Sequence, residues 1–181
     1  MQPEEASRLR EIVIECTRHV LPSCGIGVGE TLQAPAGDGD AQQVVAFMGF
    51  TGDALRGTIA VVAPLEMLRV AYPLPLVDVP QWKLEVFDWA GEIANRLLGR
   101  IRGILQPQGV HIEASTPRVM QGEQLHLTRS TQATICSACF SANDSWVRVW
   151  FDALSPDDRP LFSESRDLTD DTPAEGEPVL F

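Results

Sequence analysis

The sequence predicts an α+β domain in which antiparallel β-hairpins form a sheet that carries long amphipathic helices. Apolar residues recur with the period of a helix over 5–21 and over 80–105. Between and after these segments, runs rich in Val, Ile, Phe and Ala are separated by short turns, which is typical of hairpins. We therefore expect two antiparallel hairpin layers with the long helix packed across them.

Composition limits the class of protein. The chain of 181 residues is 44% hydrophobic, which is enough for one domain with its own core. No apolar run is long enough to span a bilayer and the start carries no signal peptide, so we expect a cytoplasmic protein with free thiols and no membrane partner. The net charge of −11, from 25 acidic and 14 basic residues, argues against nucleic acid as a partner.

The negative charge is concentrated at the C-terminus. From Ser155 to Phe181 the chain holds eight acidic and two basic residues, a net charge of −6, with few apolar residues between them. This composition is typical of disorder. We expect a folded domain over 1–154 and a disordered acidic tail over 155–181.

The N-terminal part predicts a helix, a strand start and a loop. The first helix is expected over 5–21, with Pro22 ending it. The glycine-rich stretch 25–29 is not a phosphate loop, because it follows a helix and no Gly-Lys-Ser/Thr comes after it; it favours a strand start. The stretch 34–41 is expected to be a surface loop, and its two aspartates lack the further ligands of a calcium loop.

The next segments predict a hairpin and a second helix. Residues 43–50 and 57–62 are expected to pair as antiparallel strands. A short helix follows over 65–72, stopped by Pro73. A proline-rich connector then leads to Pro80, which suits the first turn of the long helix because its missing N–H costs nothing there.

The long helix has one apolar stripe and one polar line. Its core-facing residues are Val86, Ala90, Ile93, Leu97, Ile101 and Ile104. On the opposite face Asp88, Glu92 and Asn95 follow each other at i, i+4 and i+7, and Gly99 comes next. Asn is a poor choice for a helix interior, which favours a surface that meets a partner. A merely solvated face is the alternative, since outer helix faces are polar by default.

The C-terminal half predicts more strands. We expect strands over 110–115 and 125–127, and then a hairpin of 131–141 with 145–153 around the turn Asn143-Asp144.

The last strand presents two different faces. Its side chains alternate between Val147, Val149 and Phe151 on one face and Trp146, Arg148 and Trp150 on the other. If the aliphatic set is the core, the two tryptophans are either shielded by a helix of the same chain or form a self-association surface.

Other arrangements of reactive residues are weak. Cys136-Ser-Ala-Cys139 lies in an expected strand, where i and i+3 point to opposite faces, and two further zinc ligands are missing; we read both as small, partly buried residues. The three histidines are scattered, no metal-binding pair is seen and no Gly-x-Ser-x-Gly elbow is present. Any chemistry is therefore expected to depend on a partner.

One set of motifs resembles a known family. Asp88-Trp-Ala-Gly-Glu92-Ile-Ala-Asn95, followed by Pro117, resembles the D/S-x-x-x-E-x-x-N…P signature of the CheC/CheX/FliY family, which are phosphatases of phosphorylated CheY-type response regulators. The glycine-bounded turn within 49–57 is similar as well, and so is the segment Pro117-Arg-Val-Met-Gln-Gly122. The resemblance covers about residues 5–153 with one signature helix, as in CheX.

The resemblance implies a CheC-like fold and roles for the polar line. Asn95 would hold the attacking water and Glu92 would pair with a lysine of the phosphorylated receiver. Asp88 and Gly99 would be supporting partner contacts, and Pro117 would shape the loop beside the helix without being catalytic. The protein would need no cofactor of its own, because Mg²⁺ would sit on the partner. Family members can dimerise, which implies a possible homodimer.

Two alternatives to a phosphatase stay open. The same fold can serve as a non-catalytic module that docks on a receiver domain without hydrolysis, as in flagellar-switch relatives. A structural dimer with no receiver partner is the third. The presence of both Glu92 and Asn95 favours catalysis, since a non-catalytic docking module has no need for an amide in the middle of a helix. Trp89 makes the helix bulkier than the signature leads us to expect.

Overall fold

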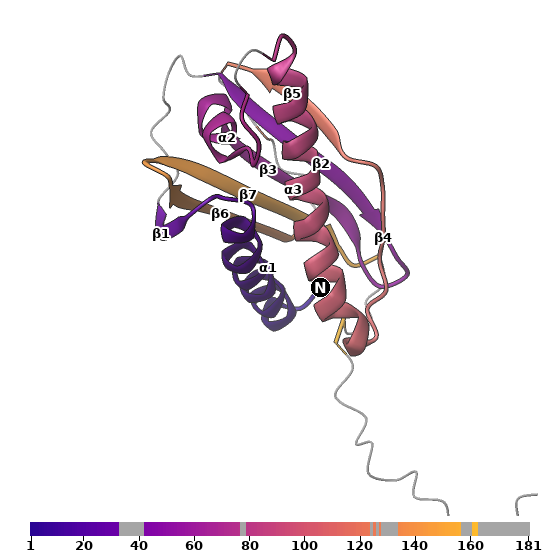
Figure 1. The fold of residues 1–181 in the computed structure, drawn as a ribbon. Coiled ribbons are helices and arrows are strands. Elements are labelled where there is room, and N and C mark those ends of the chain that lie inside the picture. Colours follow the sequence, from indigo (N-terminus) through magenta and orange to yellow (C-terminus); the bar gives the residue numbers. More distant parts are fainter. Residues whose placement is uncertain are drawn as a thin grey trace, which may run out of the picture.

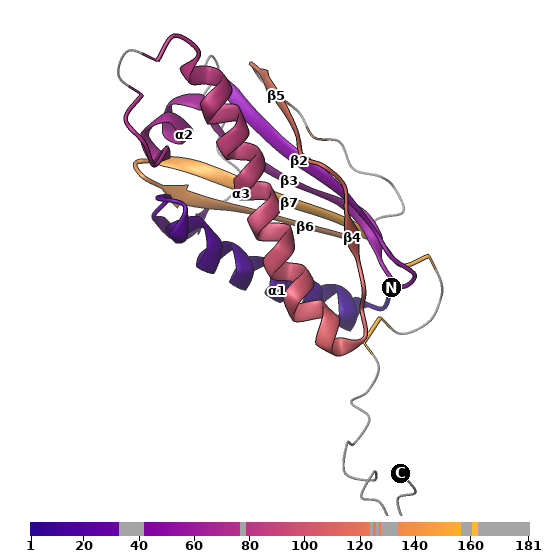
Figure 2. The same ribbon diagram turned by 45° about the vertical axis from the view of Figure 1, so that its right-hand side comes forward.

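The computed structural model describes residues 1–32, 42–76, 79–123, 125, 127, 134–156 and 161–162. Within them, one antiparallel sheet carries three α-helices on one face (Figures 1 and 2). The α+β class is confirmed. The predicted loop 34–41 lies outside the described residues.

Among the described residues, seven strands form the sheet. Their bounds are β1 Val28–Leu32, β2 Gln43–Thr51, β3 Arg56–Pro64, β4 Glu113–Ala114, β5 Arg118–Gly122, β6 Thr134–Ala142 and β7 Ser145–Leu154. The order among the described strands is β1-β6-β7-β3-β2-β4, and β5 also pairs with β2. All these pairs are antiparallel.

The two predicted hairpins form, but the expectation of two layers is wrong. Strands β2 and β3 pair, as do β6 and β7, and β3 then pairs with β7 from Arg56↔Leu154 to Val62↔Arg148. The hairpins thus lie edge to edge in one sheet. The reason is visible in β3, whose side chains from Ile59 to Val62 are buried on both faces, as expected of a central strand. The turn Asn143-Asp144 has φ of 46° and 61°, the left-handed pair that a tight hairpin requires.

Three helices cover the front face. They are α1 Pro3–Ser23, α2 Leu65–Ala71 and α3 Trp82–Leu105, and a 3₁₀ turn Gln106–Gln108 follows α3. The predicted apolar stripe of α3 is confirmed, since Val86, Ile93, Leu97 and Ile101 have no exposed surface. Together the helices and the sheet enclose one main core.

Two helix ends differ from expectation. Helix α1 continues through Pro22 to Ser23, because a proline near the last turn removes only one backbone bond. Helix α3 begins at Trp82, whose N–H bonds to Val79 O at 3.2 Å. Pro80 therefore precedes the helix instead of sitting in its first turn.

The connection after α3 also differs. The expected strand 110–115 is reduced to β4, because Val110 and Ile112 are buried in the turn under the end of α3. Strand β5 was not predicted, and it pairs with β2 from Gln43↔Gly122 to Phe47↔Arg118. The strand expected over 125–127 is wrong, since neither Leu125 nor Leu127 lies in a strand.

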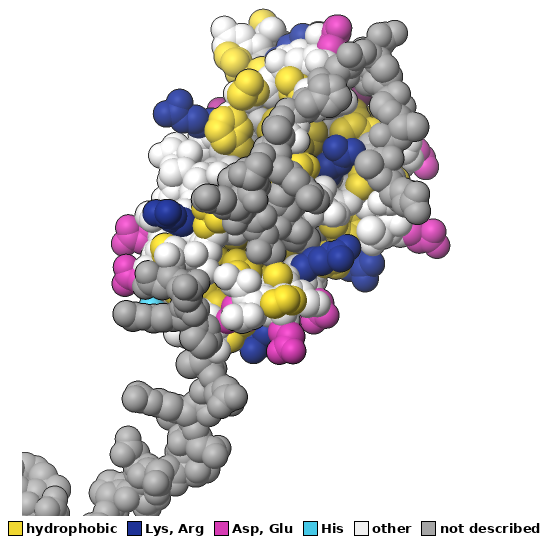
Figure 3. Space-filling view, turned by 180° about the vertical axis from the view of Figure 1, so that it is seen from behind, with side chains coloured by type: hydrophobic (Ala, Val, Ile, Leu, Met, Phe, Trp, Pro, Cys, Tyr) yellow, Lys and Arg dark blue, Asp and Glu magenta, His cyan; other side chains and the backbone are white. Residues whose placement is uncertain are grey.

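The aliphatic face of β7 is the core face. Val147, Val149 and Phe151 are buried in the main core, and the Phe151 ring stacks on Phe50 with centroids 5.0 Å apart. Trp146 belongs to a second, smaller apolar cluster on the back of the sheet. Figure 3 shows hydrophobic side chains on that back face. No helix of the described residues covers it, and self-association through it stays a prediction.

Part of the expected tail packs on the domain. Leu161 is buried in the main core and its N–H donates to a carboxylate oxygen of Glu5. The guanidinium of Arg8 lies over the Phe162 ring, 4.4 Å from its centroid. The chain just beyond β7 thus contacts the start of α1.

Candidate functional site

Helix α3 presents the predicted polar line on its open side. Asp88, Asn95 and Gly99 are exposed, and Glu92 is half-buried. A Cβ placed on Gly99 would meet nothing within 4 Å among the described atoms. The spacing predicted from the sequence therefore does bring these residues onto one accessible surface.

Pro117 lies directly beside this line. It connects β4 to β5, and a Cβ built on Gly91 would lie 3.4 Å from the Pro117 Cβ and 3.7 Å from Val119. Gly91 is buried and precedes Glu92 in the helix. The β4–β5 connection therefore lies against α3 at Gly91, where there is room for a Cβ but not for a larger side chain, and Pro117 borders the site. Its role in shaping that edge stays a prediction.

The carboxylate of Glu92 is held by two side chains of its own helix. Arg96 Nε donates to Glu92 Oε1 at 2.7 Å, and Asn95 Nδ2 donates to Glu92 Oε2 at 3.5 Å. The pKa of the Glu92 carboxyl lies below its usual value, chiefly because of the hydrogen bond from Arg96; Asn95 adds to this, and partial burial opposes it. Glu92 is therefore a carboxylate, with hydrogen-bond acceptors only, at neutral pH.

The amide of Asn95 is oriented by that carboxylate. Because its nitrogen donates to Glu92, the carbonyl oxygen Oδ1 is left to accept a hydrogen bond from outside the helix. Asn95 is exposed and Asp88, two helical turns earlier, is exposed as well. The arrangement offers one outward-facing neutral acceptor beside carboxylates.

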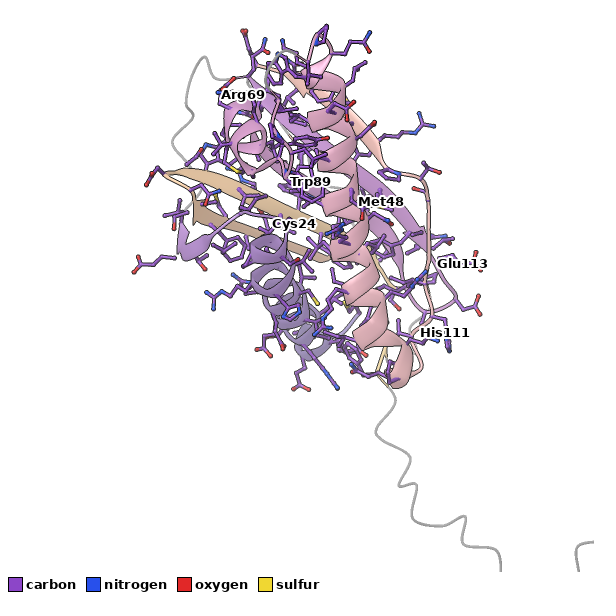
Figure 4. All side chains as sticks on the ribbon, in the orientation of Figure 1. Cys24, Met48, Arg69, Trp89, His111 and Glu113 are labelled. Atoms are coloured by element: carbon purple, nitrogen blue, oxygen red, sulfur yellow. The ribbon has the colours of Figure 1, made fainter. Side chains whose placement is uncertain are left out.

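Two neighbours of the line were not predicted as part of the site. The Arg96 guanidinium lies over the Trp89 ring, 5.3 Å from its centroid, and the Trp89 ring meets Tyr72 edge to face at 6.3 Å. In Figure 4, Trp89 lies on α3 near α2. The large Trp89 side chain, which was unexpected in the sequence, thus packs between Arg96 of α3 and Tyr72 at the end of α2. The spacing of Glu92 and Arg96, i and i+4, is the signal from which their ion pair could have been found.

A cleft among the described residues lies away from the polar line of α3. This cleft of about 540 Å³ lies at the far end of α3, lined by residues that include Arg102, His111 and Glu113, but none of the signature residues lines it (Figure 4). No group of three or more metal-binding side chains occurs among the described residues. Cys139 lies within β6 as a buried free thiol whose pKa is raised mainly by burial. None of the described helices is long and apolar enough to cross a membrane.

The antiparallel sheet with helices on one face is a fold that this chain shares with solved structures of CheC-like proteins. A CheC-like superfamily protein from Shewanella sp. PV-4 has a similar structure, with a TM-score of 0.63, 16% identity and coverage of 86% of this chain and 100% of that one. This confirms the expected fold.

The chain belongs to the chemotaxis phosphatase CheX family, whose sequence model matches residues 44–141, more than half of the chain. The chemotaxis protein CheX from Desulfovibrio desulfuricans is similar with a TM-score of 0.61 and 22% identity, covering 80% of this chain and 97% of that one. A chain of the CheX–CheY–BeF₃–Mg²⁺ complex from Borrelia burgdorferi is similar with a TM-score of 0.62 and 18% identity, covering 79% and 96%. Comparison with curated protein sequences gives no match.

Proposed function

We propose that this protein is a phosphatase that hydrolyses the aspartyl phosphate of a CheY-type receiver domain in chemotaxis or a related two-component pathway. The observation that carries the proposal is Asn95, an exposed amide whose nitrogen is bound by Glu92 and whose oxygen is open. Family membership supports it, because all the signature residues from Asp88 to Pro117 lie inside the matched range. So does the Borrelia burgdorferi complex, in which a CheX protein binds CheY.

In this proposal Asn95 orients the attacking water. Its Oδ1 accepts a hydrogen bond from a water placed in line with the phosphorus. The water oxygen bonds to phosphorus, the phosphorus–oxygen bond to the aspartate breaks, and inorganic phosphate and a free carboxylate leave, with the water's proton passing to phosphate or solvent. Holding a reactant in line is a large part of catalysis in phosphoryl transfer. A neutral amide enters an anionic site without repulsion.

The other residues of the line set the docking register. Glu92 would pair with a lysine of the receiver, whose own Mg²⁺ supplies charge stabilisation, so that this protein brings no cofactor. Asp88 would add a supporting contact, and the bare Gly99 would let the receiver backbone come close. Such a receiver acts in the cytoplasm, and we place this protein there.

The test is phosphate release from a chemically phosphorylated CheY-type receiver with Mg²⁺. We expect the wild-type protein to accelerate release and Asn95→Ala to lose about a hundredfold of that acceleration while still binding. Glu92→Ala should mainly weaken docking. Asn95→Ala should fold at least as stably as wild type, because Ala is the better helix former, which excludes unfolding as the cause. An Asn95→Ala protein with wild-type turnover would refute the mechanism.

A non-catalytic docking module is the second candidate. The observation that favours it is the Arg96–Glu92 pair, which already occupies the carboxylate in the free protein. In the same assay a docking module would bind the phosphorylated receiver and release no phosphate from it.

A further inference from the structure

Arg96 is held from two sides beside the proposed catalytic line. Its Nε donates to Glu92 at 2.7 Å, and its guanidinium lies over the Trp89 ring, 5.3 Å from the centroid. The Arg96 side chain nevertheless keeps 46% of its surface exposed. It therefore connects Glu92 with the Trp89 ring while part of its side chain stays in solvent.

These contacts distinguish Arg96 from an ordinary surface arginine. An exposed ion pair alone contributes little to stability and holds neither side chain firmly. Here the ring under the guanidinium is itself fixed, since Trp89 packs against Tyr72 and the Tyr72 hydroxyl donates to Glu85 Oε2 at 3.1 Å. The anchoring reduces the freedom of Arg96 and, through Arg96, that of Glu92.

The contacts of Arg96 lead through Glu92 to the amide of Asn95. Glu92 uses Oε1 for Arg96 and Oε2 for Asn95. An ionised carboxylate only accepts hydrogen bonds, so Asn95 must turn its NH₂ group toward Glu92 and its oxygen outward. A protonated Glu92 could donate to Oδ1 instead and would reverse the amide. Keeping Glu92 ionised and in place thus decides what Asn95 presents to the partner.

We propose that Arg96 is a positioning residue for the phosphatase reaction: stacked on Trp89, it holds Glu92 so that the Asn95 oxygen faces the attacking water. The inference rests on the proposed function and names a residue outside the Asp88…Glu92…Asn95 line. Arg96 itself touches no reacting atom.

The molecule contains a matched control. Arg69 makes the same kind of pair, with its Nε 2.7 Å from Glu66 Oε2 and its guanidinium 5.9 Å from the Trp82 centroid, and it is exposed to the same 46%. It lies on α2, and no contact of Asp88, Glu92 or Asn95 with it is found among the described residues. Removing Arg69 therefore measures what the loss of one stacked surface arginine does by itself.

The first experiment compares Arg96→Met with Arg69→Met in the phosphate-release assay. We expect Arg96→Met to lower kcat about three- to tenfold with the KM for the phosphorylated receiver unchanged within about twofold, because an unheld amide spends most of its time misoriented. Arg69→Met should match wild type. Arg96→Lys keeps the charge without the flat guanidinium and should give an intermediate kcat. Equal kcat values for Arg96→Met and Arg69→Met would overturn the inference.

The second experiment needs no partner. NMR relaxation of the Asn95 side-chain NH₂ group in the free protein should show an ordered amide in wild type and in Arg69→Met, and a mobile one, with an order parameter below about 0.6, in Arg96→Met. An Asn95 amide equally ordered in all three proteins would overturn the positioning role, even if the wild type released no phosphate. Wild-type inactivity toward a receiver it binds would instead refute the proposed function alone, so the two failures are distinguishable.

Discussion

Gly91 and Gly99 lie two helical turns apart on α3 and face different surroundings. Gly91 is buried against Pro117 and Val119, whereas a side chain on Gly99 would point into open space. Both are glycines in a helix interior, where glycine costs about 1 kcal/mol relative to alanine. Because the surroundings differ, we expect substitutions at the two positions to change the stability of the protein in opposite directions.

We predict that Gly91→Val destabilises the protein by about 1–3 kcal/mol, because its methyl groups would push Pro117 and β5 away from α3. Gly99→Ala should stabilise the protein by up to about 1 kcal/mol, since it adds helix propensity and meets nothing. Urea unfolding of both variants measures the effect. A Gly91→Val protein as stable as wild type would mean that Pro117 does not rest on α3.

At the level of single residues, the sequence predicted the polar line but not the arginine that holds Glu92 in place. The helical wheel placed Glu92 and Asn95 on one open face, because helix geometry fixes that relation whatever surrounds the helix. The Trp89 ring under Arg96 packs against Tyr72 at the end of α2, and this contact depends on how α2 and α3 pack. Local periodicity contains no information about such a contact.

Helix α3 carries an ion pair whose effect depends on pH. The folded pKa of Glu92 lies below the ordinary value of 4.5, so the stabilisation is present above about pH 4.5 and is lost as pH falls through the lowered pKa. The Glu92 side chain is 43% exposed, and an exposed i, i+4 pair contributes about 0.3–0.5 kcal/mol.

We therefore predict that Glu92→Gln is less stable than wild type by about 0.3–0.5 kcal/mol at pH 7, and that the difference disappears near pH 2. Urea unfolding of both proteins at the two pH values gives the result. A difference that stays constant with pH would show that the charge of Glu92 is not what stabilises α3.

Among the elements, the helices and the two long hairpins were predicted, whereas the short strand β5 was not. Helices α1 and α3 have apolar stripes that identify them without the rest of the fold. Strand β5 has only Val119 packed on the core, so its sequence lacks a clear alternation, and its pairing with β2 makes it a strand. Leu125 shows the reverse, an apolar residue that packs on the back cluster without joining the sheet.

In the whole molecule the β3–β7 junction unites the two hairpins. A Cβ placed on Gly57 of β3 would lie 1.9 Å from the carbonyl oxygen of Asp152, so the two backbones meet there without room for any side chain. This explains in physical terms why the segment after the β2–β3 turn contains a glycine. The sequence could not show that the hairpins share one sheet, because pairing between distant strands leaves no local pattern.

We predict that Gly57→Ala destabilises the protein by on the order of 3 kcal/mol, since it forces β3 and β7 apart. Gly49→Ala is the control, because its added Cβ would meet the nearest atom, Ser115 Oγ, at an ordinary 3.5 Å. Thermal unfolding of both variants distinguishes them. Similar losses at Gly49 and Gly57 would mean that strand propensity, and not the junction, governs the effect.

The contact between Leu161 and Glu5 brings the two ends of the folded domain together. A hydrogen bond and a ring contact thus hold residues 161–162 against the first turns of α1. A covalent cross-link between these two segments would close the domain into a loop. An unfolded chain closed into a loop of this size has fewer conformations than an open chain, by an amount worth about 5 kcal/mol. The existing contact between the two segments is the feature that would make such a cross-link favourable.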